Sequence, residues 1–281
     1  MAGDMWTDLN RPPLNADALR RALVRDAGGD PDAFWSRVDV VAETGSTNAD
    51  LLARPRDGDY ARSVLVAEYQ SGGRGRHARP WVSAPRALVT VSAVLDMPGL
   101  ELSDIGWLPL LSGIAVVDAL RNVAKVDAEL KWPNDVLIGG KKVAGILAEV
   151  AATAPVPTVV VGIGLNVSLT EDELPVPTAT SLVLEEADVA DRDILLRAVL
   201  RELARRWRDW QSVGWRVEDL TAAYRERCGT LGQLVRAELP GDRELIGIAT
   251  DVDVEGRIVI TAEGESPVAV SAGDITHLRR L

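Results

Sequence analysis

Residues 129–149 read ELKWPNDVLIGGKKVAGILAE, and this stretch is the clearest indication of a β-sheet in the chain. It holds three apolar, β-rich runs, Glu129–Trp132, Val136–Ile138 and Val143–Glu149. Short runs of this kind, separated by turn residues, are typical of strands, and Gly139-Gly140 between the last two is the signature of a tight hairpin. The stretch therefore predicts consecutive strands of one sheet.

The same stretch holds most of the lysines in the chain. All four lysines lie between Lys125 and Lys142, although the chain has 31 basic residues, so arginine serves almost everywhere else. Lysine supplies a compact, mobile point charge, whereas arginine supplies a planar fork with fixed donor directions. Lys131 and Lys142 also stand in unusual local sequence, so we assign them a function, and we attribute Lys125 and Lys141 to chance.

Outward from this stretch, β-rich runs alternate with helical periodicity. Asn15 and Ser46 or Thr47 are expected helix N-caps, because their side chains accept hydrogen bonds from free backbone N–H groups. Periodicity predicts an α+β fold, a mixed sheet flanked by helices. The further strands expected are Val38–Val41, Val64–Tyr69, Ala87–Leu95 and Thr158–Val167, and the helices are Ala16–Val24, residues 47–53, Trp107–Val123, Asp191–Trp210 and Glu218–Cys228.

The character of the chain changes after Cys228-Gly229. From Leu231 four or five short strands follow, separated by turn residues, which is the spacing of a small barrel. We therefore expect three parts: an N-terminal segment with one helix (1–35), a catalytic domain (36–228) and a C-terminal barrel (229–281). The barrel strands expected are Leu234–Glu238, Glu244–Val252, Arg257–Thr261, Val268–Val270 and Ile275–Leu278.

Composition excludes several classes of protein. The single Cys228 rules out an internal disulfide framework, and the two scattered histidines, His77 and His277, give no zinc-type cluster. A net charge of −11 opposes non-specific attraction to nucleic acid or to anionic lipid. The start, Met1–Asn10, has no apolar signal region, and the longest apolar stretches fall short of the roughly 20 residues that span a bilayer. We expect a cytoplasmic protein that is not bound to membranes.

The loop from Gln70 to Trp81 alternates glycine with arginine. Glycine lets backbone amides approach an anion, and arginine offers paired hydrogen bonds to carboxylate or phosphate. The loop is not a Walker motif, because it lacks Gly-Lys-Ser/Thr and no helix follows it. Taken alone it also fits an exposed turn or a local nucleic-acid contact.

Polar residues at strand ends and in the adjoining loops could meet on one face of the sheet. A carboxylate that attacks ATP meets like-charge repulsion, so cations must screen both partners. Asp135 could hold Mg²⁺ against phosphates and Lys142 could neutralise the developing charge. Pro133-Asn134-Asp135 also suits a plain turn. The full set is Gln70, Arg74, Arg76, Lys131, Asn134, Asp135, Lys142 and Asn166.

Five motifs, in this order, resemble those of the biotin protein ligases. They are Ser46-Thr47-Asn48, Gln70 with Gly73-Arg74-Gly75-Arg76 through Arg79 and Trp81, Lys131-Trp132-Pro133-Asn134-Asp135, Lys142 to Leu147, and Gly162 to Asn166. The resemblance covers the chain from about Val38 to its end. It implies a class II synthetase-like catalytic fold with an SH3-like barrel. It also implies that biotin and ATP form biotinyl-5'-adenylate and diphosphate, and that biotin then passes to a lysine of a carrier domain.

The resemblance also implies roles for individual residues. Ser46, Thr47 and Gln70 would hydrogen-bond the ureido ring of biotin, with Gly145 supplying a backbone contact. Lys142 would bridge the biotin carboxylate and the α-phosphate, and with Arg76 and Arg79 it forms the expected catalytic set. Arg74, Gly75 and Arg76 would also bind biotin. The nucleotide would be bound by Arg76, Arg79, Trp81, Lys131, Asn134 and Asn166, and Mg²⁺ by Asp135.

One departure from the family pattern concerns the arginine loop. Ala78 stands where the family usually has glycine, which should stiffen the loop. We expect the loop to be mobile without ligand, because it is rich in glycine and its charges repel each other. Some family members also repress transcription, but only one helix precedes the first catalytic strand, so we expect no DNA binding.

The implied partner is the biotin carboxyl carrier domain of acyl-CoA carboxylases, with the protein acting as a monomer or weak homodimer. Two alternatives stay open. A lipoate or octanoate ligase of the same fold also uses one lysine, and a non-catalytic biotin sensor could share the pocket.

Overall fold

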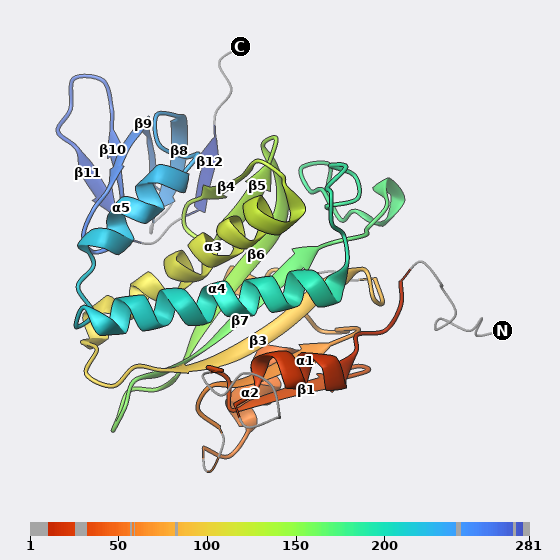
Figure 1. Ribbon diagram of the computed structural model, residues 1–281. Helices are drawn as coiled ribbons and strands as arrows, with labels where there is room; N and C mark the ends of the chain where they lie inside the picture. Colours follow the sequence, from red (N-terminus) through yellow and green to blue (C-terminus); the bar gives the residue numbers. More distant parts are fainter. Residues whose placement is uncertain are drawn as a thin grey trace.

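The computed structural model describes residues 11–25, 33–56, 58, 60–81, 84–239, 243–271 and 274–277. The expectation about Met1–Asn10 lies outside these ranges. Figure 1 shows a larger unit with a long helix pair and a smaller β-rich unit near the C-terminus.

A seven-stranded mixed sheet forms the centre of the larger unit, as predicted. Its order is β1-β2-β3-β7-β6-β5-β4, with β1 and β2 parallel and all other neighbours antiparallel. The three runs of residues 129–149 form β4, β5 and the start of β6, so the predicted hairpin is confirmed. The strands are β1 (Arg37–Val41), β2 (Ser63–Ala67), β3 (Leu88–Asp96), β4 (Ala128–Lys131), β5 (Asp135–Ile138), β6 (Lys141–Ala152) and β7 (Thr158–Asn166).

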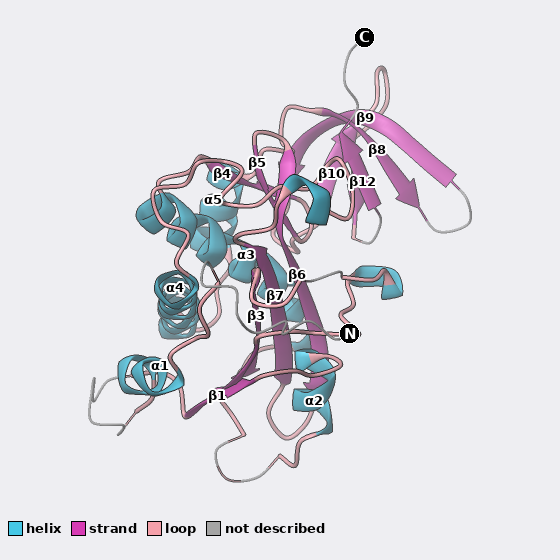
Figure 2. Ribbon diagram, turned by 90° about the vertical axis from the view of Figure 1, so that its right-hand side faces the viewer, coloured by secondary structure: helices cyan, strands magenta, loops and turns pink. Residues whose placement is uncertain are grey.

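Helices cover both faces of this sheet, with α1, α3 and α4 on one side and α2 on the other (Figure 2). The expected caps are confirmed: Asn15 accepts from the Ala18 N–H, and Ser46 accepts from the Ala49 N–H. The helices are α1 (Ala16–Leu23), α2 (Thr47–Ala53), α3 (Trp107–Ala119), α4 (Arg192–Ser212) and α5 (Glu218–Arg227), with short helical turns η1 (Arg76–Ala78), η2 (Leu102–Gly106), η3 (Leu120–Ala124, a π-helix) and η4 (Glu171–Glu173).

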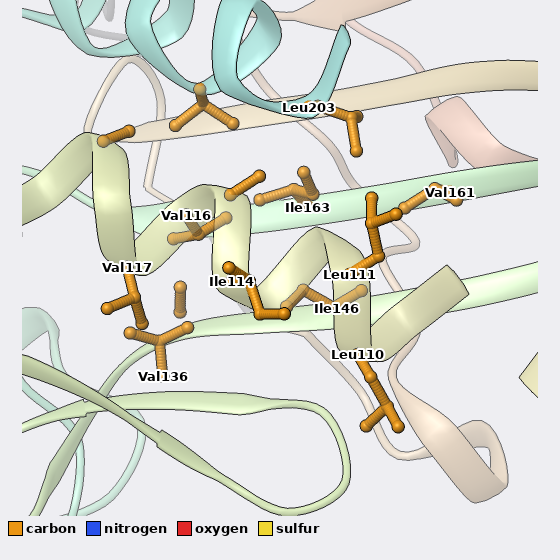
Figure 3. Close-up of a cluster of buried hydrophobic side chains, with 14 of the residues drawn as sticks. Leu110, Leu111, Ile114, Val116, Val117, Val136, Ile146, Val161, Ile163 and Leu203 are labelled. Carbon is orange, nitrogen blue, oxygen red and sulfur yellow. The ribbon is translucent and has the colours of Figure 1, made fainter. Parts of the chain in front are cut away.

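Helix α3 is the centre of the hydrophobic core. It is apolar on all sides because α4 covers one side of it and the sheet covers the other. In Figure 3, Leu111 and Ile114 of α3 meet Ile146 and Ile163 of the sheet, and Leu203 of α4 closes the cluster from above. Leu102–Ala124 is long and apolar enough to cross a membrane by length and composition alone. Its burial inside the fold is instead that of a core helix.

The C-terminal unit is a five-stranded antiparallel sheet in the order β11-β10-β9-β8-β12, in agreement with the expected SH3-like barrel. Trp107 and Trp132 anchor it to the larger unit, because their indole N–H groups donate to the carbonyls of Val254 and Gly256, each at 2.9 Å. The strands are β8 (Leu234–Leu239), β9 (Arg243–Val252), β10 (Ile258–Thr261), β11 (Val268–Val270) and β12 (Asp274–His277).

Candidate active site

Three glycines leave one face of the central strands bare. Gly145 of β6 pairs with Gly164 of β7, and Gly162 lies two residues before Gly164 on the same face. A Cβ atom at Gly162 would lie 2.4 Å from Asn48 Oδ1, and one at Gly164 would lie 2.5 Å from the indole ring of Trp81. The α2 face of the sheet can therefore hold a cavity only while these positions carry no side chain.

A cavity of about 280 Å³ opens on this bare face. It brings together residues from α2, the arginine loop, β5, β6 and β7, which lie far apart in the sequence. Lys131 is the one predicted site residue that does not line it, because it lies on the edge strand β4. The predicted residues that line it are Ser46, Thr47, Gln70, Arg74, Gly75, Arg76, Arg79, Trp81, Asn134, Asp135, Lys142, Gly145 and Asn166.

One end of the cavity is a buried polar pocket under the N-terminus of α2. The Gln70 side-chain carbonyl accepts from the Thr47 backbone N–H at 2.9 Å and lies 3.2 Å from the Thr47 hydroxyl. Thr47 is only 3% exposed and Gln70 only 8% exposed. Buried polar atoms need partners, so this pocket suits a small ligand with its own hydrogen-bonding edge.

The other end is charged and centres on Lys142. Its Nζ atom lies 2.6 Å from Asp135 Oδ1 and 5.2 Å from the centre of the Trp81 ring. Both side chains are partly buried, so the ion pair holds the ammonium group in the cavity rather than in open solvent.

The donor set around Asp135 offers one carboxylate for a cation. No group of three or more His, Cys, Asp or Glu side chains with metal-binding geometry occurs within the described ranges. A single carboxylate fits Mg²⁺ that is held mainly by nucleotide phosphates, which is how Mg²⁺ commonly binds in such sites. The assignment of Asp135 to Mg²⁺ stays a prediction.

The arginine loop joins β2 to β3, as predicted, and folds over the charged end. Arg76 donates to Asn134 Oδ1 at 3.3 Å, and Asn134 in turn donates to the Ile146 carbonyl at 3.0 Å. Arg74 and Arg79 are exposed at the rim. Ala78 has a φ of +56°, a left-handed conformation that favours glycine.

One wall of the cavity consists of residues that the sequence motifs did not predict. Pro175, Val176 and Ala179 line it. The backbone of Lys142 pairs with this segment on both sides, since its N–H donates to the Thr178 carbonyl at 2.7 Å and its carbonyl accepts from the Thr180 N–H at 2.9 Å. The segment has no strand periodicity, so no local signal marks it.

The described part of the N-terminal segment supports this wall. Arg11 forms a bidentate ion pair with Glu173, at 2.9 and 2.5 Å, and also donates to the Ser168 carbonyl at 2.6 Å. Hydrogen bonds from the Arg11 guanidinium group lower the pKa of Glu173 to about 2. Arg11 therefore fixes the turn that leads into the wall segment.

Comparison with known proteins agrees with this geometry. Residues 41–166 match the Biotin/lipoate A/B protein ligase family, and residues 230–278 match the Biotin protein ligase C terminal domain. The chain is 44% identical over 276 residues to the biotin--[acetyl-CoA-carboxylase] ligase of Mycobacterium tuberculosis, covering 97% of this chain and 98% of that one. It is 30% identical to the bifunctional ligase/repressor BirA of Escherichia coli, over 80% of this chain and 69% of that one.

Solved structures show the same likeness. The biotin protein ligase from Aquifex aeolicus in complex with biotin and ATP superposes with a TM-score of 0.72 at 26% identity, covering 88% of this chain and 100% of that one. Sequence identity over nearly the whole chain, the two matched domains and the shared fold agree. The chain therefore belongs to the biotin protein ligases, within the biotin/lipoate A/B protein ligase family.

Proposed function

We propose that this ligase activates biotin with ATP and then transfers the biotinyl group to one lysine of a biotin carboxyl carrier domain. In the first step, a carboxylate oxygen of biotin attacks the α-phosphorus of ATP, and diphosphate leaves. In the second step, the lysine amine attacks the carbonyl carbon of the mixed anhydride, and AMP leaves with the electron pair of the broken C–O bond. The observation that carries the proposal is one cavity with a buried polar pocket at one end and Lys142 at the other.

Lys142 has the central role in both steps. The reacting carboxylate and the α-phosphate are both anionic, so a cation between them stabilises the charge that develops as the bond forms. The ammonium group of Lys142 is held in the cavity by Asp135 at 2.6 Å, and it can exchange this carboxylate for the reacting anions. The same group then stabilises charge on the phosphate as AMP leaves.

The arginine loop supplies the remaining positive charge. Arg74, Arg76 and Arg79 line the cavity from a glycine-rich segment, and their guanidinium groups can each form paired hydrogen bonds with carboxylate or phosphate oxygens. Trp81, beside Lys142, and Asn166 line the part of the cavity assigned to the nucleotide. Mg²⁺, when bound with ATP at Asp135, would neutralise phosphate charge.

The buried polar pocket favours biotin over the alternatives. Thr47 and Gln70 present hydrogen-bonding atoms at an almost fully buried position. The ureido ring of biotin can add hydrogen bonds to these atoms, whereas a dithiolane ring or an alkyl chain would shield them from water without adding any. A sensor without catalysis would have no need for Lys142 beside the arginine loop.

Transfer to a carrier domain tests the proposal. A purified biotin carboxyl carrier domain is incubated with the protein, ATP, Mg²⁺ and either biotin or lipoate, and its intact mass is measured. The expected result is one biotinyl group added, only with biotin, and none on a carrier whose acceptor lysine is replaced by arginine. A lipoyl adduct would move the protein to the sister activity, and no adduct with either acid would favour the sensor.

A further inference from the structure

A chain of hydrogen bonds runs behind the polar pocket, buried at Thr47 and Ser92 and partly buried where it ends at Glu149. Asn48 Nδ2 lies 2.6 Å from Glu149 Oε2 and 3.3 Å from the Leu147 carbonyl. The Ser92 hydroxyl lies 2.6 Å from Asn48 Oδ1 and 2.7 Å from Thr47 Oγ1. Ser92 is fully buried and Asn48 is 6% exposed. Helix α2 supplies Thr47 and Asn48. The neighbouring strands β3, β7 and β6 place Ser92 opposite Gly162 and Gly162 opposite Leu147.

The direction of each hydrogen bond in this chain follows from the count of hydrogen atoms. Asn48 faces two acceptors with one side of its amide, so its amino group must be on that side and Oδ1 must face Ser92. Oδ1 can only accept, so the single hydroxyl hydrogen of Ser92 goes to Asn48. The short contact between Ser92 and Thr47 then requires Thr47 to donate.

These hydrogen-bond directions leave the hydroxyl oxygen of Thr47 as an acceptor that faces the cavity. Its hydrogen has two possible acceptors, Ser92 Oγ at 2.7 Å and Gln70 Oε1 at 3.2 Å, and Gln70 Oε1 already accepts from the Thr47 backbone N–H. The shorter contact takes the hydrogen. The unused lone pairs of Thr47 Oγ1 are then left for an N–H group of a ligand.

All donors in the chain point the same way, from the cavity to a carboxylate. Hydrogen bonds in series strengthen one another, and one that ends on an ionised group is stronger than a neutral one. We infer that Ser92, Asn48 and Glu149 are positioning residues that fix the Thr47 hydroxyl as an acceptor and thereby select a ligand with an N–H group at that point. The inference rests on the proposed function, in which this group belongs to the ureido ring of biotin.

The test compares biotin with the two mono-N-methylated biotins, each lacking one ureido N–H. The wild type is expected to bind biotin much more tightly than the analogue methylated on the nitrogen that faces Thr47. Replacement of Ser92→Ala should weaken biotin binding about tenfold, the worth of one buried hydrogen bond. It should leave the binding of that analogue almost unchanged, so that the selectivity ratio shrinks. Calorimetry measures both dissociation constants.

A matched control is Ser112→Ala. Ser112 is equally buried, and its hydroxyl donates to the Leu108 carbonyl at 2.7 Å within α3, away from the cavity. The Ser112→Ala protein should be less stable than the wild type, but its ratio of affinities for biotin and the methylated analogue should be unchanged. A Ser92→Ala protein that binds biotin and both analogues weaker by one common factor would overturn the inference, because a purely structural role predicts that result.

A second variant protects the test against misfolding of Ser92→Ala. Glu149 is only partly buried, and Glu149→Gln keeps an acceptor oxygen for Asn48 while removing the charge. It should reduce the selectivity ratio about threefold, and an unchanged ratio would contradict the inference. Failure of the proposed function can be distinguished from failure of this inference. A wild-type protein that forms no biotin-dependent adenylate would refute the function. If the wild type forms the adenylate but both variants keep the wild-type selectivity ratio, only the role of the hydrogen-bond chain is refuted.

Discussion

The two ends of the cavity are built in opposite ways. The polar end rests on the sheet and on α2, and its side chains are 0–8% exposed and bonded to one another. The charged end is formed largely by a loop whose Arg74 and Arg79 are exposed. The difference shows how one site can combine two tasks. In the proposed function, the polar end would recognise a neutral ring before chemistry begins, and the charged end would gather positive charge around the anions as they bind.

Removal of the Lys142 ammonium group should have the largest effect on catalysis. Lys142→Ala is expected to slow adenylate formation about 100- to 1,000-fold, the usual loss when a preorganised electrostatic group is removed. Biotin binding should fall much less, because the polar end is intact. Single-turnover rates and calorimetry separate the two quantities.

Lys141→Ala is the matched control, since the neighbouring lysine is exposed and does not line the cavity. It should behave as the wild type does. Adenylation by Lys142→Ala at the wild-type rate would show that the charged end works without this cation.

A small change in the polar end should weaken biotin binding and lower stability. Gly162→Ala places a methyl group 2.4 Å from Asn48 Oδ1, so α2 or the Asn48 side chain must move. We expect biotin to bind at least about tenfold more weakly and the melting temperature to fall by about 4 °C or more. Gly106→Ala is the control, because the added Cβ atom would have no neighbouring atom within 4 Å, and it should change neither biotin affinity nor melting temperature. Wild-type biotin affinity in Gly162→Ala would show that the polar end adapts as readily as the loop.

The arginine loop at the charged end should become more resistant to protease when ligands bind. Trypsin is expected to cut after Arg74 and Arg76 in the empty protein, and biotin with ATP and Mg²⁺ should slow these cuts several-fold as the charges are neutralised. Cleavage after exposed Arg56, outside the cavity, serves as the internal reference. Equal cleavage of the loop with and without ligands would mean that its order does not depend on anions.

The smallest effect concerns the wall that holds the Lys142 backbone. Because the pKa of Glu173 is lowered to about 2 in the folded protein, its pair with Arg11 contributes stability fully above the ordinary value of 4.5. That contribution is lost as pH falls from 4.5 toward 2. Wild type should therefore exceed Arg11→Gln in melting temperature at pH 7, and the difference should shrink between pH 4.5 and pH 3. A constant difference over this range would assign the loss to packing of Arg11 rather than to its charge.

Local sequence signals predicted most of the fold. The N-caps Asn15 and Ser46, the hairpin at Gly139-Gly140 and the strands of the sheet agree with the structure to within about three residues, because periodicity and turn chemistry are local properties. The strand order could not be read from periodicity, since it depends on contacts between distant segments.

The site was predictable where motifs marked it and hidden where only tertiary contacts create it. The wall at Pro175 and Ala179 carries no periodic pattern, and Ser92 is one polar residue in an apolar strand, so neither stood out. Lys131 shows the converse: its motif suggested a place in the site, but the edge position of β4 keeps it away from the cavity. Its assignment to the nucleotide stays a prediction.

Mass spectrometry after incubation with ATP and Mg²⁺, once with biotin and once with lipoate, detects which acyl-adenylate the protein forms. We expect biotinyl-5'-adenylate and no lipoyl adduct, because the buried polar end accepts a ring with N–H groups and rejects one without them. A lipoyl adenylate at an equal or greater yield would contradict that claim.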